Sequence, residues 1–339
     1  MKFYISLLLF LIISNVSCAT SKFDSPYFED DKFVNIDRIP EKTFSEFWGF
    51  ASNFKRDWPE SLESTKAEPV VQKVKTGVKW TFINHASFLI QTDGLNIITD
   101  PIWSERCSPV SFAGPKRVRE ASLQYDDLPK KIDLVFISHN HYDHMDLPSL
   151  RVLNERFKPI FFVGLNNSPE LMSVGIPRDR IIERDWFKDF TLGETTFTFL
   201  PAQHWSKRSL FDDREAQWGS MLIRSKEGHK VYHGGDTGYG SHFKMIQEKY
   251  GDMDLSFIPI GAYEPRDFMR DQHLNPDDAV MAHLDLKSKE SVGMHFGTFE
   301  LTYESPEQPI YDLDKARLKY KIDKKSFYSP KFGQVGILR

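Results

Sequence analysis

The stretch Asp133–His144, which reads DLVFISHNHYDH, decides the fold of this chain of 339 residues. Its first half is a short apolar run of the kind that forms a buried β-strand. Its second half has the pattern His-x-His-x-Asp-His, and it offers three imidazoles and one carboxylate within six residues. Imidazole nitrogen and carboxylate oxygen are ligands that zinc prefers. Because a turn at a strand end can direct alternate side chains to two neighbouring points, the motif predicts a two-metal site.

Three further candidate ligands follow other predicted strands downstream of this motif. They are His204 after a strand over 195–200, Asp236 after a strand over 230–233, and His295 at the end of a strand over 291–295. Each residue alone is a weak signal, since a single histidine at a strand end is more often structural. Together, and in this order after the motif, they complete two coordination shells that six positions cannot fill.

The remainder of the chain from residue 76 onward mixes short strands with helices. The expected strands cover 79–84, 87–92, 96–100, 133–138, 195–200, 220–224, 230–233, 255–260 and 291–295, and the expected helices cover 147–157, 241–250 and 276–286. Asn275 and Pro276 supply an N-cap and a first-turn proline for the last of these helices. The mixture predicts one layered α/β domain over 76–339, with its chemistry at the strand ends.

The composition excludes several classes of protein. Hydrophobic residues make up 40% of the chain, which rules out a disordered or fibrous protein. Lys and Arg number 44 against 48 Asp and Glu, so the formal net charge is −4 and no nucleic-acid partner is expected. The two cysteines, Cys18 and Cys107, allow at most one disulfide, so the fold is not a disulfide scaffold.

The N-terminus predicts export. Lys2 precedes an apolar run over 3–13 that is too short to span a bilayer and is typical of a signal peptide. We expect residues 1–18 to contain a lipoprotein-type signal, with Cys18 becoming the lipidated first residue of the mature protein. The protein would then be a membrane-anchored lipoprotein of the bacterial outer membrane or periplasm. An ordinary signal peptide cleaved near Ala19 is the alternative.

Residues 19–75 are expected to form a polar, irregular N-terminal extension. It contains one aromatic cluster, Phe44, Phe47, Trp48 and Phe54, whose spacing suits one face of a short helix. Two interpretations stay open for this helix: it packs on the main core, or it presents a surface to a membrane or to the chains of a substrate.

Several longer stretches carry a resemblance that extends well beyond the metal motif. They are His85–Ser87, Thr99–Pro101, Gly114–Arg117, Ile137–His144, His204–Arg208, Gly235–Tyr239, Pro259–Arg266 and His295–Phe299. On these residues the chain resembles the metallo-β-lactamase superfamily. Within it, the chain most resembles N-acylphosphatidylethanolamine-hydrolysing phospholipase D and its bacterial relatives.

The resemblance implies a four-layer αββα sandwich with two zinc ions at one edge, between the sheets. The implied ligands are His139, His141 and His204 for one zinc, Asp143, His144 and His295 for the second, and Asp236 as a bridge between both. A carboxylate in the bridging position argues against the antibiotic-hydrolysing branch, which uses cysteine there. Cys107 does not match that position.

The activity that the resemblance implies is hydrolysis of a phospholipid phosphodiester bond. Two divalent ions generate hydroxide near neutral pH and bind both the attacking and the leaving oxygen. We expect Asp143 and Asp236 to orient a zinc-bound hydroxide for in-line attack on phosphorus. Cleavage of an N-acylphosphatidylethanolamine-like lipid would release phosphatidic acid and an N-acylethanolamine.

Other residues are candidates for binding the phospholipid. The resemblance implies that Tyr142 and His273 contact the phosphate region, where each can donate a hydrogen bond. Two basic pairs, Lys116-Arg117 and Lys207-Arg208, are expected either to attract the anionic headgroup or to lie on solvated surface. His85 is expected to be a supporting or structural group and not a ligand.

Two other functions remain open from the sequence. The same metals could serve a lactonase or a small-molecule phosphodiesterase, as in related branches of the superfamily. The protein could also be a non-catalytic, metal-binding surface lipoprotein, although seven candidate ligands argue against a structural site, which is normally closed with four. The sequence also leaves a homodimer possible.

Overall fold

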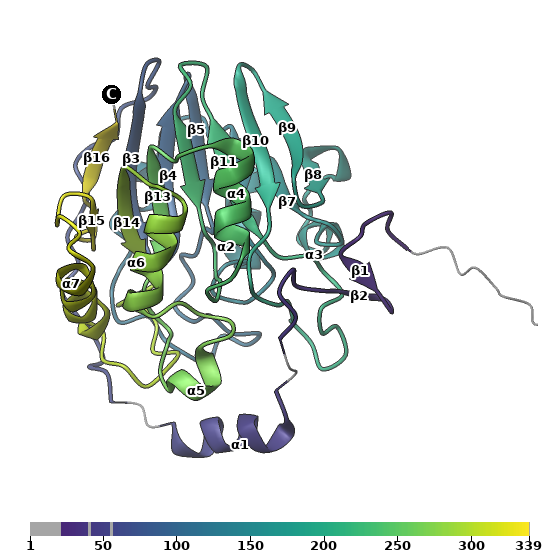
Figure 1. Cartoon of the computed structure of the whole chain (residues 1–339). Helices are drawn as coiled ribbons and strands as arrows, with labels where there is room; N and C mark the ends of the chain where they lie inside the picture. Colours follow the sequence, from purple (N-terminus) through teal and green to yellow (C-terminus); the bar gives the residue numbers. More distant parts are fainter. Residues whose placement is uncertain (1–21, 40–41, 55–56, 339) are drawn as a thin grey trace, which may run out of the picture.

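The computed structural model describes residues 22–39, 42–54 and 57–338. Two seven-stranded sheets pack face to face, and helices cover both outer faces (Figure 1). This arrangement confirms the predicted four-layer αββα sandwich. The predicted signal segment, with Cys18, lies outside the described residues. Within the described ranges, no helix has the length and apolar character needed to cross a membrane.

The two sheets each combine antiparallel and parallel strands. The first sheet has the order β16 (Val335–Leu338), β3 (Val78–Asn84), β4 (Ser87–Thr92), β5 (Leu95–Thr99), β6 (Leu134–Phe136), β7 (Ile160–Gly164) and β8 (Ile181–Arg184). The second has the order β15 (Phe327–Tyr328), β14 (Glu290–Met294), β13 (Leu255–Pro259), β12 (Lys230–His233), β11 (Ser220–Arg224), β10 (Thr195–Leu200) and β9 (Lys188–Leu192). A separate two-stranded sheet pairs β1 (Phe28–Glu29) with β2 (Lys32–Phe33).

The helices divide between the two outer faces. The first sheet carries α2 (Leu147–Phe157) and α3 (Ser168–Ser173), and the second carries α4 (His242–Tyr250), α6 (Pro276–Asp285) and α7 (Gln308–Tyr320). Alternate residues of β6 show why the layers form: Leu134 and Phe136 pack in the core between the sheets, while Val135 packs beneath α2 and α3. In the inter-sheet core, the Phe88 and Phe257 rings lie 4.1 Å apart and join the two sheets.

The strand directions bring many loops to one edge of the sandwich. Strands β5 to β8 run parallel, and so do β12 to β15. Strand β10 is antiparallel to β11, which is antiparallel to β12, so β10 and β12 end at the same edge. In the first sheet, β3 is antiparallel to β4, which is antiparallel to β5, so β3 ends at the same edge as β5 and β6. The segments after β3, β6, β10, β12 and β14 therefore meet there.

Every strand and helix expected from the sequence is present, with ends that shift by at most two residues. The elements that were not anticipated are β1, β2, β7, β8, β9, α3, α5, α7, β15 and β16, together with short 3-10 turns at Tyr125–Asp127 and Arg178–Arg180. Strand β9 is mostly exposed, and β15 has two residues, so neither carries a strong apolar pattern in the sequence.

The N-terminal segment is part of the same body. Its helix α1 (Phe44–Asn53) lies below the short helix α5 (Arg266–Met269) in Figure 1. The Phe50 ring stacks on Phe268 at 4.9 Å and on Tyr303 at 5.4 Å, and Phe54 stacks on Tyr303 at 5.8 Å. These contacts support packing on the main body. Trp48 is 64% exposed, and the side chains of Phe44 and Phe47 lie outside the described part of the chain.

Candidate metal centre

The loop that follows β6 carries four of the predicted ligands into the edge between the sheets. The apolar strand ends at Phe136, and the loop then turns through the His-x-His-x-Asp-His motif. The backbone N–H groups of His144 and Met145 both donate to the carbonyl of His141, which closes this turn. The loop therefore presents its side chains to two adjoining points within a short span.

The first group of ligand atoms comes from His139, His141 and His204. His139 Nε2 lies 2.8 Å from His141 Nδ1, and His204 Nε2 lies 3.2 Å from the same atom. Burial, with the neighbouring histidines, lowers the pKa of His141 to about 3. Burial also lowers the pKa of His204 to about 4, against the opposing effect of Asp236. All three imidazoles are thus held neutral, which is the form that binds a metal.

The second group comes from Asp143, His144 and His295. His144 Nε2 lies 3.5 Å from Asp143 Oδ2 and 3.1 Å from His295 Nε2, and His295 Nε2 lies 3.3 Å from Asp143 Oδ2. Burial opposes ionisation of Asp143, but the facing histidines outweigh it and hold the pKa of the carboxyl well below its usual range. Burial opposes protonation of His295, yet Asp236 and Asp143 raise its pKa to about 9.

Asp236 lies between the two groups, at the end of β12. Its Oδ2 is 3.2 Å from His144 Nε2 and 3.9 Å from the Nε2 atoms of both His139 and His204, while its Oδ1 is 3.1 Å from His295 Nε2. The preceding Gly235 has φ of 58°, and a Cβ there would lie 2.6 Å from Ser138 Cβ. A glycine is therefore required for the β12 turn to approach the motif loop this closely.

The donor set fits a pair of divalent cations. The ligand atoms of these seven side chains converge on two adjoining points. Several imidazole nitrogens face each other at about hydrogen-bond distance, and neutral imidazoles, with one N–H each, cannot satisfy all of these contacts by hydrogen bonds among themselves. The two carboxylates add negative charge to a largely buried cluster, which is costly unless cations compensate it. The predicted ligands are thus brought together, and the residues suit zinc or a similar metal.

Buried partners fix the ligand side chains, and sequence reasoning had not assigned these roles. Asp100, after β5, accepts hydrogen bonds from the backbone N–H of Ser138 at 2.7 Å and its hydroxyl at 2.8 Å, and it lies 2.9 Å from His144 Nδ1. A carboxylate behind a ligand histidine orients the ring and raises its basicity. The Thr99-Asp100-Pro101 stretch at a strand end was the signal from which this role could have been inferred.

The N-terminal segment also holds a ligand in place. The Asn35 side chain donates to the carbonyl of His204 at 2.8 Å and accepts from its backbone N–H at 3.0 Å. Its Oδ1 also accepts from Trp218 Nε1 at 3.1 Å. The segment that the sequence presents as an irregular extension therefore contributes to the metal centre. A single asparagine in a polar segment gives no sequence signal for this contact.

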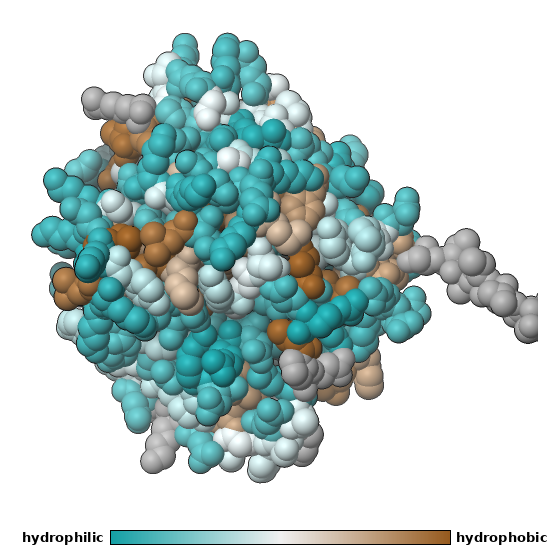
Figure 2. Space-filling view, in the orientation of Figure 1, coloured by the Kyte–Doolittle hydropathy of each residue, from teal (hydrophilic) through white to brown (hydrophobic). Residues whose placement is uncertain are grey.

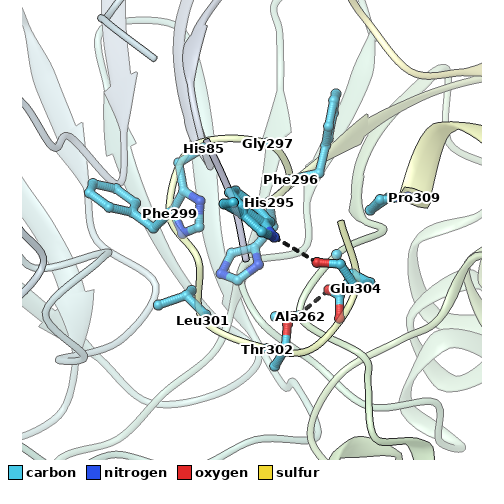
Figure 3. Close-up of a pocket in the computed structure, with 12 residues that line it drawn as sticks. His85, Ala262, His295, Phe296, Gly297, Phe299, Leu301, Thr302, Glu304 and Pro309 are labelled. Atoms are coloured by element: carbon cyan, nitrogen blue, oxygen red, sulfur yellow. Dashed lines mark hydrogen bonds between the residues drawn. The ribbon is translucent and has the colours of Figure 1, made fainter. Parts of the chain in front are cut away.

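His85 lies at the edge of the second group. Its Nε2 is 3.0 Å from Asp143 Oδ2, and its ring centroid is 4.0 Å from that of His295. Burial lowers its pKa to about 4. Figure 3 shows His85 and His295 facing a small cavity that Phe299, Glu304 and other residues line. The position agrees with the expected supporting role, and it also places His85 within reach of the same metal position.

The residues predicted to bind substrate fall into two sets. His273 reaches the centre: its Nδ1 is 3.9 Å from Asp236 Oδ2, and its ring is 5.1 Å from that of His204. Tyr142 is partly exposed beside the motif loop and donates through its hydroxyl to the carbonyl of Arg208 at 2.6 Å. Trp205, which had not been singled out, lies edge-on to His141 at 4.8 Å.

The basic pairs serve mainly structural contacts in this structure. Arg208 donates to the backbone carbonyls of Asn140 and Met145 at 2.7 and 2.9 Å, so it supports the motif loop, while Lys207 is partly exposed. Arg117 is buried and donates to the carbonyls of Ser104 and Ile102. Lys116 pairs with Glu105 at 2.9 Å. A headgroup contact by these side chains stays a prediction.

The sequence comparisons agree with this geometry. Residues 95–296 match the family model described as "Beta-lactamase superfamily domain". The chain belongs to the metallo-β-lactamase superfamily. It is 36% identical to N-acyl-phosphatidylethanolamine-hydrolyzing phospholipase D 1 of Caenorhabditis elegans, over 77% of this chain and 76% of the relative. It is 34% identical to the uncharacterized protein Rv0906 of Mycobacterium tuberculosis, over 85% of this chain and 79% of that protein.

A more distant relative is described as a metal-dependent hydrolase, and a solved structure shares the fold of this chain. A UPF0173 metal-dependent hydrolase of Myxococcus xanthus is 25% identical over 81% of this chain and 90% of the relative. The metallo hydrolase Igni18 of Ignicoccus hospitalis shares the fold with a TM-score of 0.58 and 24% identity, covering 78% of this chain and 99% of Igni18. The protein is thus a metal-dependent hydrolase with the metallo-β-lactamase fold.

Proposed function

We propose that this hydrolase is a phospholipase D-type phosphodiesterase that uses two zinc ions. Its substrate would be an N-acylphosphatidylethanolamine-like lipid, and its products would be phosphatidic acid and an N-acylethanolamine. The observation that carries the proposal is the similarity to the Caenorhabditis elegans phospholipase, which spans about three quarters of both chains. The complete set of seven convergent ligands supports it, because catalysis on a phosphodiester uses two adjoining metal ions.

The residues of the chain have separate tasks in this reaction. His139, His141 and His204 would hold one ion, Asp143, His144 and His295 the other, and Asp236 would contact both. When bound, two such ions act as Lewis acids toward the phosphoryl oxygens and lower the pKa of bound water.

His273 stands beside the ligands with its ring buried. Burial holds its pKa well below the usual range, against the opposing effect of Asp236, so the neutral ring can donate one hydrogen bond to a phosphoryl oxygen. Tyr142 lies at the partly exposed side of the centre and supplies a phenol that can reorient from the Arg208 carbonyl toward a phosphate. These two groups would position the phosphodiester.

The test is a comparison of two lipids with the metal-loaded protein. N-acylphosphatidylethanolamine should yield phosphatidic acid and N-acylethanolamine, whereas plain phosphatidylethanolamine should react much more slowly. Asp143→Asn should lose turnover of the first lipid while the far-UV circular dichroism stays that of the wild type. Release of neither product, with opening of a lactone instead, would replace this proposal by the lactonase alternative.

We also propose that the mature protein is exported and anchored to a membrane through lipidated Cys18. The sequence at residues 1–18 supports this, and the lipid substrate would then lie on the same surface as the enzyme. Mass spectrometry of the protein purified from its native membrane should show an acylated N-terminal cysteine. A free thiol at Cys18 would contradict the anchor.

A further inference from the structure

Two loops beside the metal centre carry unusually exposed apolar side chains. Among the described residues, four large hydrophobic side chains are more than 80% exposed: Phe112, Leu210, Phe211 and Leu318, at 82%, 83%, 88% and 81%. Leu318 is on α7. Phe112 lies at the tip of residues 107–115, here named the first apolar loop, and Leu210 and Phe211 lie at the tip of residues 207–214, the second apolar loop. The face drawn in Figure 2 is largely hydrophilic, with apolar side chains in small separate spots.

Both apolar loops flank Tyr142, next to the metal ligands. In the first loop, Cys107 packs in a small cluster with Phe299, against which Tyr142 also packs. In the second loop, the carbonyl of Arg208 accepts the Tyr142 hydroxyl, and the Arg208 guanidinium lies 4.1 Å from the centre of the Tyr142 ring. The bases of both loops therefore lie beside the partly exposed Tyr142, next to the metal ligands.

The bases of both loops are fixed, so the tips are held outward. Cys107 donates its backbone N–H to the carbonyl of Pro115 at 3.2 Å, which closes the first loop. In the second loop, the Asp212 carboxylate accepts from the backbone N–H of Arg208 at 3.1 Å and of Ser209 at 2.7 Å. Ordering such a tip in advance reduces the entropy that binding would otherwise cost.

The charge pattern of the tips favours a lipid surface over water. Residues 107–115 read CSPVSFAGP and 209–211 read SLF, without a charged side chain. The two acidic residues that follow have partners within the protein: Asp212 accepts from the Ser209 backbone N–H, and Asp213 pairs with Lys32 at 3.2 Å. Lys207 lies partly exposed at the base of the second loop, where a cation would meet an anionic headgroup.

We propose that Phe112, Leu210 and Phe211 enter the interfacial region of a lipid bilayer and direct the metal centre toward it. The choice of a bilayer as the occupant rests on the proposed phospholipid substrate. Large apolar side chains at rigid, uncharged tips gain by leaving water, and each one buried in the acyl boundary strengthens partitioning roughly tenfold or more. A substrate lipid could then reach the metals without leaving the membrane fully.

The first experiment reports the local environment of each tip. Phe112→Cys, Phe211→Cys and, as a matched control, Leu318→Cys are made in the full chain with Cys18→Ser, which removes the predicted lipid anchor. Cys107 is buried, so a polarity-sensitive fluorophore labels only the introduced cysteine. On addition of phosphatidylcholine–phosphatidylglycerol vesicles, labels at 112 and 211 should shift to the blue, and the label at 318 should not.

The second experiment measures binding itself, without turnover. In the same Cys18→Ser background, Leu210→Ser combined with Phe211→Ser should lower co-sedimentation with the same vesicles by roughly a hundredfold, about tenfold for each side chain, whereas Leu318→Ser should leave it unchanged. Metal content and circular dichroism identify a variant that has failed to fold, and the fluorophore data then decide. Because no lipid is cleaved in either assay, vesicle binding by the tips would stand even if phosphatidic acid is never released.

Three outcomes would overturn the inference. Labels at 112 and 211 that stay water-like while the protein sediments with vesicles would show that the tips remain outside the bilayer. A Cys18→Ser chain with unaltered tips that does not sediment with the vesicles would show that the tips do not bind a bilayer. Blue-shifted labels without vesicles, together with a doubled mass in light scattering, would assign the tips to a contact between two copies of the chain.

Discussion

Replacement of Asn35 by alanine should weaken both the fold and the metal centre. Asn35 is buried, and its amide pairs with the backbone N–H and the carbonyl of His204 at 3.0 and 2.8 Å. Asn35→Ala leaves both backbone groups without that partner. A buried polar group that loses its hydrogen bond costs about 1–3 kcal/mol, so the two together should cost about 2–6 kcal/mol of unfolding free energy. Trp218 loses little, because its Nε1 also donates to Ala202.

The effect should reach the metal through the position of His204. Loss of a group that orients a metal ligand typically weakens metal affinity by about 10- to 100-fold. Competition with a chromophoric chelator gives the zinc affinity, and urea unfolding gives the stability. Asn35→Asp keeps the acceptor for the His204 N–H but loses the donor, so its zinc affinity should fall between those of the wild type and Asn35→Ala.

Asn167→Ala is the matched control for this prediction. Asn167 is also buried, and its amide donates to the carbonyls of Gly164 and Gln217 at 3.0 and 2.8 Å, but it contacts no metal ligand. It should lose comparable stability while zinc affinity stays unchanged. If Asn35→Ala binds zinc as tightly as Asn167→Ala does, the N-terminal segment contributes packing alone and the reasoning is wrong.

Three further predictions concern a backbone position, pH and metal removal. Gly235→Ala should lower the free energy of unfolding by well over the roughly 1 kcal/mol expected of Gly228→Ala, because both glycines have positive φ but only Gly235 lacks room for a Cβ. Urea unfolding of the two variants compares the losses, and equal losses would refute the steric argument. Burial lowers the pKa of His283 to about 4, so below pH 6.5 the unfolded chain binds more protons and stability falls as the pH drops toward 4. The difference between the two pKa values is worth about 3 kcal/mol of unfolding free energy. Urea unfolding of His283→Gln should therefore show a smaller loss of stability between pH 6.5 and 4 than the wild type does, and the same pH profile in both proteins would contradict the prediction. Chelation should abolish hydrolysis and lower the melting temperature, and zinc should restore both, since the cluster of seven ligands holds two buried carboxylates; activity that survives complete metal removal would exclude the proposed centre.

The sequence was most informative where local patterns are strong. The helix over 147–157 and the strands over 87–92 and 220–224 have the predicted ends, because their apolar periodicity and flanking residues are local signals. The metal ligands could be named for a similar reason: imidazole and carboxylate groups at successive strand ends have a specific chemistry. Strand β9, with its mostly exposed residues, gave no such signal.

Contacts between distant residues could not be read in this way. Asn35 and His204 are 169 positions apart, and their pairing depends on where the N-terminal segment crosses the sandwich. Arg208 belongs to a basic pair that suggested a headgroup site, yet its guanidinium binds carbonyls of the motif loop. The sequence gives the charge of a side chain, but only the folded structure shows which groups that side chain contacts.

The sequence by itself therefore determined the fold class, the superfamily and the side chains able to bind metal. The tertiary structure alone decided how those side chains are held: Asp100 behind His144, Asn35 on the backbone of His204, and Gly235 at the closest approach of two loops. The physical reason is that strand direction brings residues from both sheets to one edge. Hydrogen bonds and steric limits at that edge involve atoms whose proximity arises only when the sheets pack.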